Sequence, residues 1–155
     1  MSAHAATSAE TDLLALDQQV CFALAVASRN VIALYRPILE PMGLTHPQYL
    51  AMLALWGRSP LSVKELGRML SLEPATLSPL LKRLESAGLV SRGRQPTDER
   101  ALAVNLTPRG RELRAQALKV PPAIIERLGM SLTELQDLHG ALTRVIGATA
   151  PADAT

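Results

Sequence analysis

Apolar residues recur with helical spacing over most of the chain. Four leucines in its middle follow the i, i+3, i+4, i+7 rule of a helix with one buried stripe: Leu77, Leu80, Leu81 and Leu84. The positions that such a helix turns outward carry hydroxyl and basic side chains: Thr76, Ser78, Lys82 and Arg83. Small hydroxyl side chains followed by positively charged side chains suit a helix face that enters a DNA groove.

A second short helix is predicted just before this one. Ser62 and Glu65 have the spacing of a capping box, and Leu61 and Leu66 are placed as its hydrophobic staple, so a helix should run from 63 to about 70. Glu73-Pro74 marks the start of the next helix. If its regular part starts at Thr76, Pro79 falls in the opening turn, where its missing N–H costs little.

A two-stranded ribbon should follow these helices. Gly88 ends the helical pattern, Leu89-Val90 leads into a first strand, and residues 92–100 form a basic hairpin. Residues 101–106 alternate, with one packed face made of Leu102, Val104 and Leu106 and another made of Ala101, Ala103 and Asn105. Two helices and a basic hairpin indicate a winged helix-turn-helix within a mainly α fold that has a small β-wing.

Long helical patterns flank this unit. Residues 11–39 carry a long apolar stripe that Pro37 should bend or end, and a capping box at Thr45 to Gln48 opens a buried helix over 49–56. Residues 109–119 are helical until Pro121-Pro122, the pattern resumes to Gly129, and a capping box at Ser131 to Glu134 opens a last helix to about 146. So much apolar surface on terminal helices predicts a partner subunit.

These patterns give one domain of residues 11–147. We expect a disordered tail over residues 1–10 and a flexible tail over 148–155. Within the domain, residues 45–106 form the DNA-binding part, and 11–42 and 108–147 form dimerisation helices.

Composition narrows the function. The four aromatic residues, Phe22, Tyr35, Tyr49 and Trp56, are too few for single-strand binding by base stacking. The single cysteine, Cys21, excludes an intrachain disulfide and a cysteine-rich zinc site and fits a reducing cytosol. His4, His46 and His139 lie too far apart to form a metal motif, so no metal or other cofactor is predicted. No signal peptide is indicated, and no apolar run approaches the ~20 residues that span a bilayer, so we expect a cytoplasmic protein without a membrane partner.

Positive charge is concentrated in the middle of the chain. From Arg58 to Arg114 there are eleven Lys and Arg against six acidic residues, a net of +5, whereas the whole chain carries +2. A polyanion would be attracted to this middle part and not to the ends, as expected for a phosphate-binding module.

Several linked motifs resemble the MarR family of winged-helix repressors. They occur in order as Gly43-Leu44-Thr45-His46-Pro47-Gln48-Tyr49-Leu50, Leu66-Gly67, Thr76 to Glu85, Gly88-Leu89-Val90 and Asp98-Glu99-Arg100. With Cys21-Phe22-Ala23-Leu24 and Tyr35-Arg36-Pro37, the chain looks similar to the organic hydroperoxide resistance regulator (OhrR) branch, over about residues 16–125.

The resemblance implies a homodimer that binds a pseudo-palindromic double-stranded operator. Two recognition helices would enter successive major grooves about 34–36 Å apart. The residues implied or expected to bind DNA lie on the recognition helix and the wing: Thr76, Ser78, Pro79, Lys82, Arg83, Arg94, Asp98 and Arg100. Arg100 falls at the position that reaches the minor groove, and Asp98 at the position that holds the wing in shape. Lys82 and Arg83 equally suit phosphate contacts, which position a protein without specifying a sequence.

The resemblance also implies that Cys21 is an oxidisable switch, with Tyr35 and His46 as its companions; a tyrosine is usual in the family where His46 stands. If Cys21 and Tyr35 share one continuous helix, fourteen residues separate them by roughly 21 Å. Tyr35 could then reach Cys21 only across a dimer, and a protonated His46 from the partner could favour the thiolate. An organic hydroperoxide would give a sulfenic acid that a small thiol or a backbone nitrogen caps. The alternative is an inert core cysteine.

Other functions remain open at this stage. A repressor of the same fold could be released by a small, perhaps aromatic, ligand between the dimer helices and the DNA domain, with Cys21 structural. A thiol peroxidase is poorly supported, because no base or resolving thiol lies near Cys21 in sequence, so we expect no enzyme. A helical interaction protein that does not bind DNA is the least supported alternative, because it would not need the positive charges of the hairpin.

Overall fold

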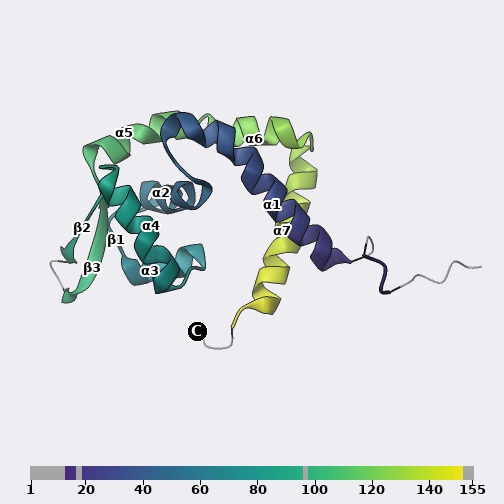
Figure 1. The fold of residues 1–155 in the computed structure, drawn as a ribbon, viewed down its shortest axis with the longest axis horizontal. Coiled ribbons are helices and arrows are strands. Elements are labelled where there is room, and N and C mark those ends of the chain that lie inside the picture. Colours follow the sequence, from purple (N-terminus) through teal and green to yellow (C-terminus); the bar gives the residue numbers. More distant parts are fainter. Residues whose placement is uncertain (1–12, 17–18, 96–97, 152–155) are drawn as a thin grey trace, which may run out of the picture.

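The computed structural model describes residues 13–16, 19–95 and 98–151, with the backbone alone for residues 95 and 98–101. Helices dominate, and a small antiparallel sheet lies at one end of the molecule (Figure 1). The elements in chain order are α1 (Val20–Leu39), the 3-10 helix η2 (Glu40–Met42), α2 (His46–Gly57), β1 (Leu61–Ser62), α3 (Val63–Leu70), α4 (Pro74–Ser86), β2 (Val90–Gln95), β3 (Asp98–Leu106), α5 (Pro108–Ala117), α6 (Val120–Leu128) and α7 (Leu132–Thr149).

The middle of the chain forms a closely packed head. Helices α2, α3 and α4 surround a core of leucines that β1 to β3 complete, and α5 leads away from the sheet toward α6 (Figure 1). The four leucines of the α4 stripe, Leu77, Leu80, Leu81 and Leu84, are all buried, which confirms that face of the helix. The predicted fold class, mainly α with a winged helix-turn-helix, is confirmed.

Local capping signals fix three helix starts as predicted. Thr45, Ser62 and Ser131 each accept a hydrogen bond from the backbone N–H three residues later, and the side chains of Gln48, Glu65 and Glu134 accept in return. Each capping box satisfies two backbone N–H groups that a helix start leaves unpaired.

The sheet differs from the predicted two-stranded ribbon. Its order is β1-β3-β2, with Leu61 paired to Val104 and Ser62 to Ala103. Pairing with β1 ends at Ala103, so Ala103 and Val104 are both buried, whereas Leu102 is 48% exposed. The prediction that Leu102 lies on a packed face was therefore wrong.

Two predicted boundaries were also wrong, the start of α1 and the end of α7. Helix α1 begins at Val20 and not near residue 11, because Leu13 and Leu14 lie in a turn. Helix α4 begins at Pro74, directly after Glu73, as predicted. Its regular part therefore does not wait until Thr76, and Pro79 lies inside the helix and not in its opening turn. Helix α7 continues to Thr149, past the predicted end near 146, so residues 148 and 149 are helical and not part of a tail.

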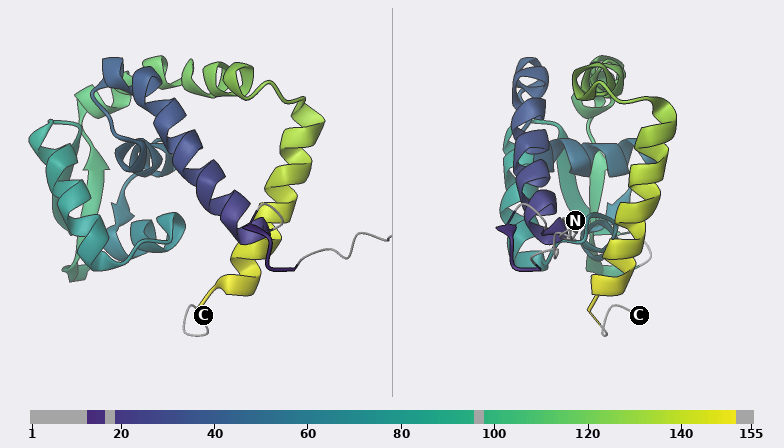
Figure 2. Two further views of the ribbon diagram at one scale, coloured as in Figure 1. Left: turned by 45° about the vertical axis from the view of Figure 1, so that its right-hand side comes forward. Right: turned by 90° about the vertical axis from the view of Figure 1, so that its right-hand side faces the viewer.

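The terminal helices extend away from the head. Helix α6 continues the line of α5, and α7 turns back after Gly129, separated from the head over most of its length in the left view of Figure 2. No residue of α7 is buried, and Leu39 is the only buried residue of α1. Apolar side chains on both helices are exposed, among them Val20 at 71% and Ile146 at 63%.

The segment Val20–Met42 is long and apolar enough to cross a membrane by length and composition, although no such run was predicted. It contains Arg29 and Arg36, and α1 contacts α2 and α6. Its apolar side chains include Val20, Phe22 and Ile32, which are exposed on α1.

Candidate functional site

Helix α4 presents a polar face to solvent. Thr76, Ser78, Lys82 and Arg83 are all exposed, as the stripe of leucines on the opposite side requires. Pro79 is also exposed, between Ser78 and the buried Leu80. The helix can therefore offer two hydroxyls and two cations to a ligand without disturbing the core.

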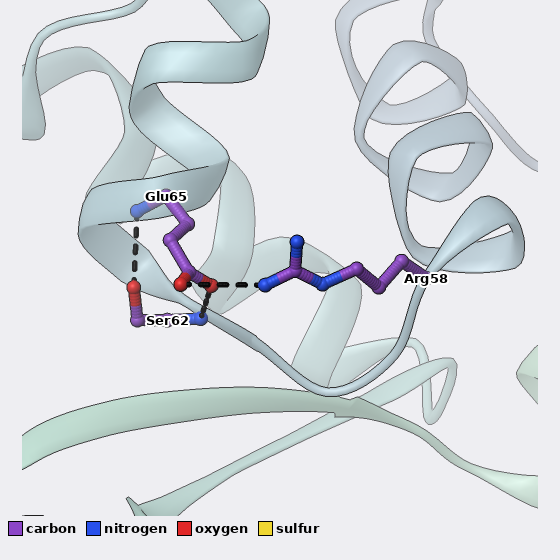
Figure 3. Close-up of polar contacts among 3 residues, drawn as sticks. All are labelled: Arg58, Ser62 and Glu65. Atoms are coloured by element: carbon purple, nitrogen blue, oxygen red, sulfur yellow. Dashed lines mark hydrogen bonds and ion pairs between the residues drawn. The ribbon is translucent and has the colours of Figure 1, made fainter.

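Helix α3 is locked at its start against the end of α2. Glu65 accepts from the backbone N–H of Ser62 at 3.1 Å and from Nη2 of Arg58 at 3.4 Å, while its own N–H donates to Ser62 Oγ at 3.0 Å (Figure 3). The capping carboxylate thus also joins α3 to the residue that ends α2.

The turn between α3 and α4 is tight. The N–H of Leu72 donates to the carbonyl of Gly67 at 2.9 Å, and a Cβ on Gly67 would lie 3.0 Å from the Leu72 carbonyl oxygen and 3.5 Å from Leu77. Ser71 adopts a left-handed backbone, with φ at 54°. Glycine therefore permits the close approach that sets the angle of α4 on α3.

The wing is the hairpin of β2 and β3. Arg94 is exposed and pairs with Leu102 of β3, and a register shift follows it at Gln95. Asp98 and Arg100 lie on β3, but their side chains are outside the described residues, so their predicted roles stay predictions.

An ion pair that the sequence patterns did not predict ties the wing to α4. Glu85, near the end of α4, accepts from the backbone N–H of Arg92 at 3.2 Å and from its Nε at 3.3 Å. These contacts hold the pKa of Glu85 below its usual range. The seven-residue separation across a helix end and a turn is no recognised signal, so only the fold brings the two together.

Cys21 lies at the start of α1 and is exposed. Helix α1 is continuous from Cys21 to Tyr35, so the helical rise separates them by roughly 21 Å along the axis. Within one chain the predicted companions of the thiol are therefore remote from it.

Tyr35 and His46 instead lie against each other. Their ring centroids are 4.7 Å apart, and the Tyr35 ring lies 5.8 Å from the buried Tyr49. Burial raises the pKa of Tyr35 and lowers that of His46 below its ordinary value of 6.5. Burial therefore disfavours the protonated form of His46. Tyr49 was not among the predicted site residues, although it stands three positions after His46, the spacing of one helix face.

Comparison with known proteins gives a consistent result. The family model described as "MarR family" matches residues 44–102. The chain is 40% identical over 131 residues to the organic hydroperoxide resistance transcriptional regulator of Bacillus subtilis, covering 84% of this chain and 89% of that protein.

Solved structures with the same fold include two bacterial regulators. A probable transcriptional regulator from Pseudomonas aeruginosa has a TM-score of 0.74 and 33% identity, and the match covers 85% of this chain and all of that chain. Reduced AbfR bound to DNA has a TM-score of 0.70 and 34% identity, covering 86% and 93% of the two chains. AbfR of Staphylococcus epidermidis has also been solved in overoxidized, DNA-bound and disulfide forms.

Proposed function

The chain belongs to the MarR family of transcriptional regulators, and we propose that it is a homodimeric repressor that organic hydroperoxides release from DNA by oxidising Cys21. One observation carries the sensing part. The only cysteine is exposed on a terminal helix, in a chain that is 40% identical to an organic hydroperoxide resistance regulator over 84% of its length.

The DNA-reading part rests on α4 and the wing. The hydroxyls and cations of α4 suit base edges and phosphates of a major groove, and a wing arginine suits the narrow minor groove beside it. The reduced AbfR structure bound to DNA supports this use of the fold, since that protein is 34% identical to this chain. Such a regulator would work in the cytoplasm.

The dimer rests on the exposed apolar faces of α1 and α7. Side chains such as Val20 and Ile146 would gain roughly 25 cal/mol for each Å² of apolar surface removed from water. A second copy is the partner that buries the same faces on both chains at once.

Sensing would proceed as a two-electron oxidation. The Cys21 thiolate attacks one peroxide oxygen, the O–O bond breaks, and the alcohol leaves with a proton while the cysteine becomes a sulfenic acid. A small thiol then condenses with it, giving a mixed disulfide and water. Because Tyr35 and His46 are remote from Cys21 within one chain, we propose that the partner's copies of these residues complete the site.

The test is a mobility shift on the DNA upstream of the protein's own gene, with and without cumene hydroperoxide. Cys21→Ser should bind like the parent and stay bound with the oxidant, whereas the parent should be released. Ala27→Ser, an exposed substitution on the same helix, serves as the matched control and should release normally. Release of the Cys21→Ser variant by the hydroperoxide would refute the sensor assignment.

A groove favours a second candidate, release by a small apolar ligand. It has a volume of about 1090 Å³ and lies between the helix-turn-helix and the end of α7, lined by apolar residues that include Val63, Leu72, Leu77, Leu102 and Ile146. In that case Cys21→Ser would still respond to inducer, and a thermal-shift screen would find a stabilising compound.

A further inference from the structure

We propose that Glu85 is a positioning residue for DNA reading, which fixes the wing relative to the recognition helix. This inference rests on the proposed use of α4 and the wing as DNA-reading elements. Glu85 lies one residue before the end of α4, and Arg92 lies on β2, the first strand of the wing. Their contact is therefore a direct link between the two reading elements.

The link has more than one point. Oε2 of Glu85 accepts from the backbone N–H of Arg92 at 3.2 Å and from its Nε at 3.3 Å, and Oε1 accepts from Nη2 at 3.5 Å. A carboxylate held by a guanidinium and a backbone N–H fixes both direction and distance, which a single contact would not.

The backbone bond has a structural reason. Strand β2 is at the edge of the sheet, where alternate N–H groups have no strand partner. Glu85 accepts one of them, so the carboxylate takes the place of a neighbouring strand and ties the base of the wing to α4. Arg94 follows on the same face of β2, two residues along, so a contact that holds Arg92 against α4 also limits where Arg94 can lie.

The negative charge of Glu85 allows a positioning role to be distinguished from a purely electrostatic effect on DNA binding. A carboxylate beside a DNA-reading face repels phosphates, so by charge alone its removal should raise affinity for every duplex. A positioning role predicts the opposite for the operator, because α4 and the wing must reach adjacent grooves together. The two effects have opposite signs and can be separated by comparing specific with non-specific DNA.

The experiment compares binding of the full-length chain to its own upstream duplex and to a random duplex of equal length. Glu85→Ala should lose about fivefold to tenfold in affinity for the upstream duplex and gain slightly for the random one. Arg92→Ala should lose as much, and the double variant no more than either single variant. Glu85→Gln keeps an oxygen for the Arg92 N–H and should retain most of the affinity.

Glu73→Gln is the matched control, since it removes the same charge beside the same helix and the Glu73 side chain makes no hydrogen bond or ion pair among the described residues. It should raise binding to both duplexes alike. The dependence of log affinity on log salt should be as steep for Glu85→Ala as for the parent, because no phosphate contact is lost.

Amide exchange gives a readout without DNA. The Arg92 N–H should exchange faster in Glu85→Ala than in the parent or in Glu73→Gln. Unchanged operator affinity in Glu85→Ala, or an equal gain on both duplexes, overturns the positioning role. A parent protein that shows no preference for its upstream duplex overturns the proposed function, and this role with it.

Discussion

Gly110 shows how a single residue joins the terminal helices to the DNA-reading head. It lies in the first turn of α5, donates its N–H to Thr107 Oγ1 at 3.0 Å, and accepts from Nε1 of Trp56 at 2.9 Å. Thr107 in turn donates its hydroxyl to the carbonyl of Gly88 at 2.6 Å. The start of α5 is thus fastened to α2 and to the turn that ends α4.

Gly110→Ala should destabilise the protein. A Cβ there would lie 2.1 Å from the carbonyl oxygen of Leu89, a backbone atom that cannot move without displacing the wing. We expect the free energy of unfolding to fall by about 1–3 kcal/mol, measured by urea denaturation. Gly140→Ala, where a Cβ meets nothing within 4 Å, should instead raise it by about 0.5–1 kcal/mol. Equal effects of the two substitutions would contradict the packing described for Gly110.

His46 should make stability depend on pH in one direction. Burial lowers its pKa in the folded chain below the ordinary 6.5, so the unfolded chain binds more protons between the two values. The contribution of neutral His46 is present above pH 6.5 and is lost as the pH falls through the folded pKa. The urea midpoint of the parent should therefore fall more steeply below pH 6.5 than that of His46→Gln.

The sequence specifies the residues of the reading face well and the contacts between elements poorly. Outward positions on α4 follow from the leucine stripe, because a helix with one buried side leaves no choice for the others. The contact of Tyr35 with His46 depends on how α1 meets α2, and that of Glu85 with Arg92 depends on how the wing folds back. Neither has a local pattern in the sequence.

At the scale of elements, α4 contains a proline that should lower its stability, and this effect can be measured. Pro79 has no N–H to donate to the carbonyl of Ala75, four residues earlier, and it lies inside the helix. Pro79→Ala should raise the free energy of unfolding by about 1 kcal/mol or more. Pro74→Ala, at the first helical position where proline is tolerated, should change it little. If Pro79→Ala instead lowers the free energy of unfolding, the proline ring stabilises the protein by more than the missing hydrogen bond costs.

Helix starts marked by a capping box were predictable, and the start of α1, which has no capping signal, was not. Ser62 and Ser131 mark the starts of α3 and α7, whereas Gln19 precedes α1 without any side-chain cap, so nothing local separates α1 from the apolar residues before it. Strand β1 is only two residues long and has no detectable alternation. The shortness of β1 also explains why Leu102 is exposed, because Leu102 lies beyond the part of β3 that pairs with β1.

At the scale of the whole molecule, the exposed helices determine what the chain can do alone. Apolar residues on α7 continue at helical spacing over Leu135, Leu138, Leu142 and Val145, and α7 has no buried residue. A face of this kind that no element of the same chain covers predicts association. We therefore expect a dimer by sedimentation velocity and an unfolding midpoint that rises with protein concentration.

Leu138→Glu should convert this dimer to monomers, because it places a carboxylate within the apolar face of α7. Met69→Glu, at an exposed apolar residue of α3 in the head, is the control for association and should remain dimeric. Linked heads bind the second half-site at an effective concentration that separate heads lack, so the monomeric variant should lose about a hundredfold or more in operator affinity. Its affinity for a single half-site should match that of the parent. If Leu138→Glu stays dimeric, the interface lies elsewhere; if it becomes monomeric and keeps full operator affinity, the two heads read DNA independently and no signal at Cys21 could act through their spacing.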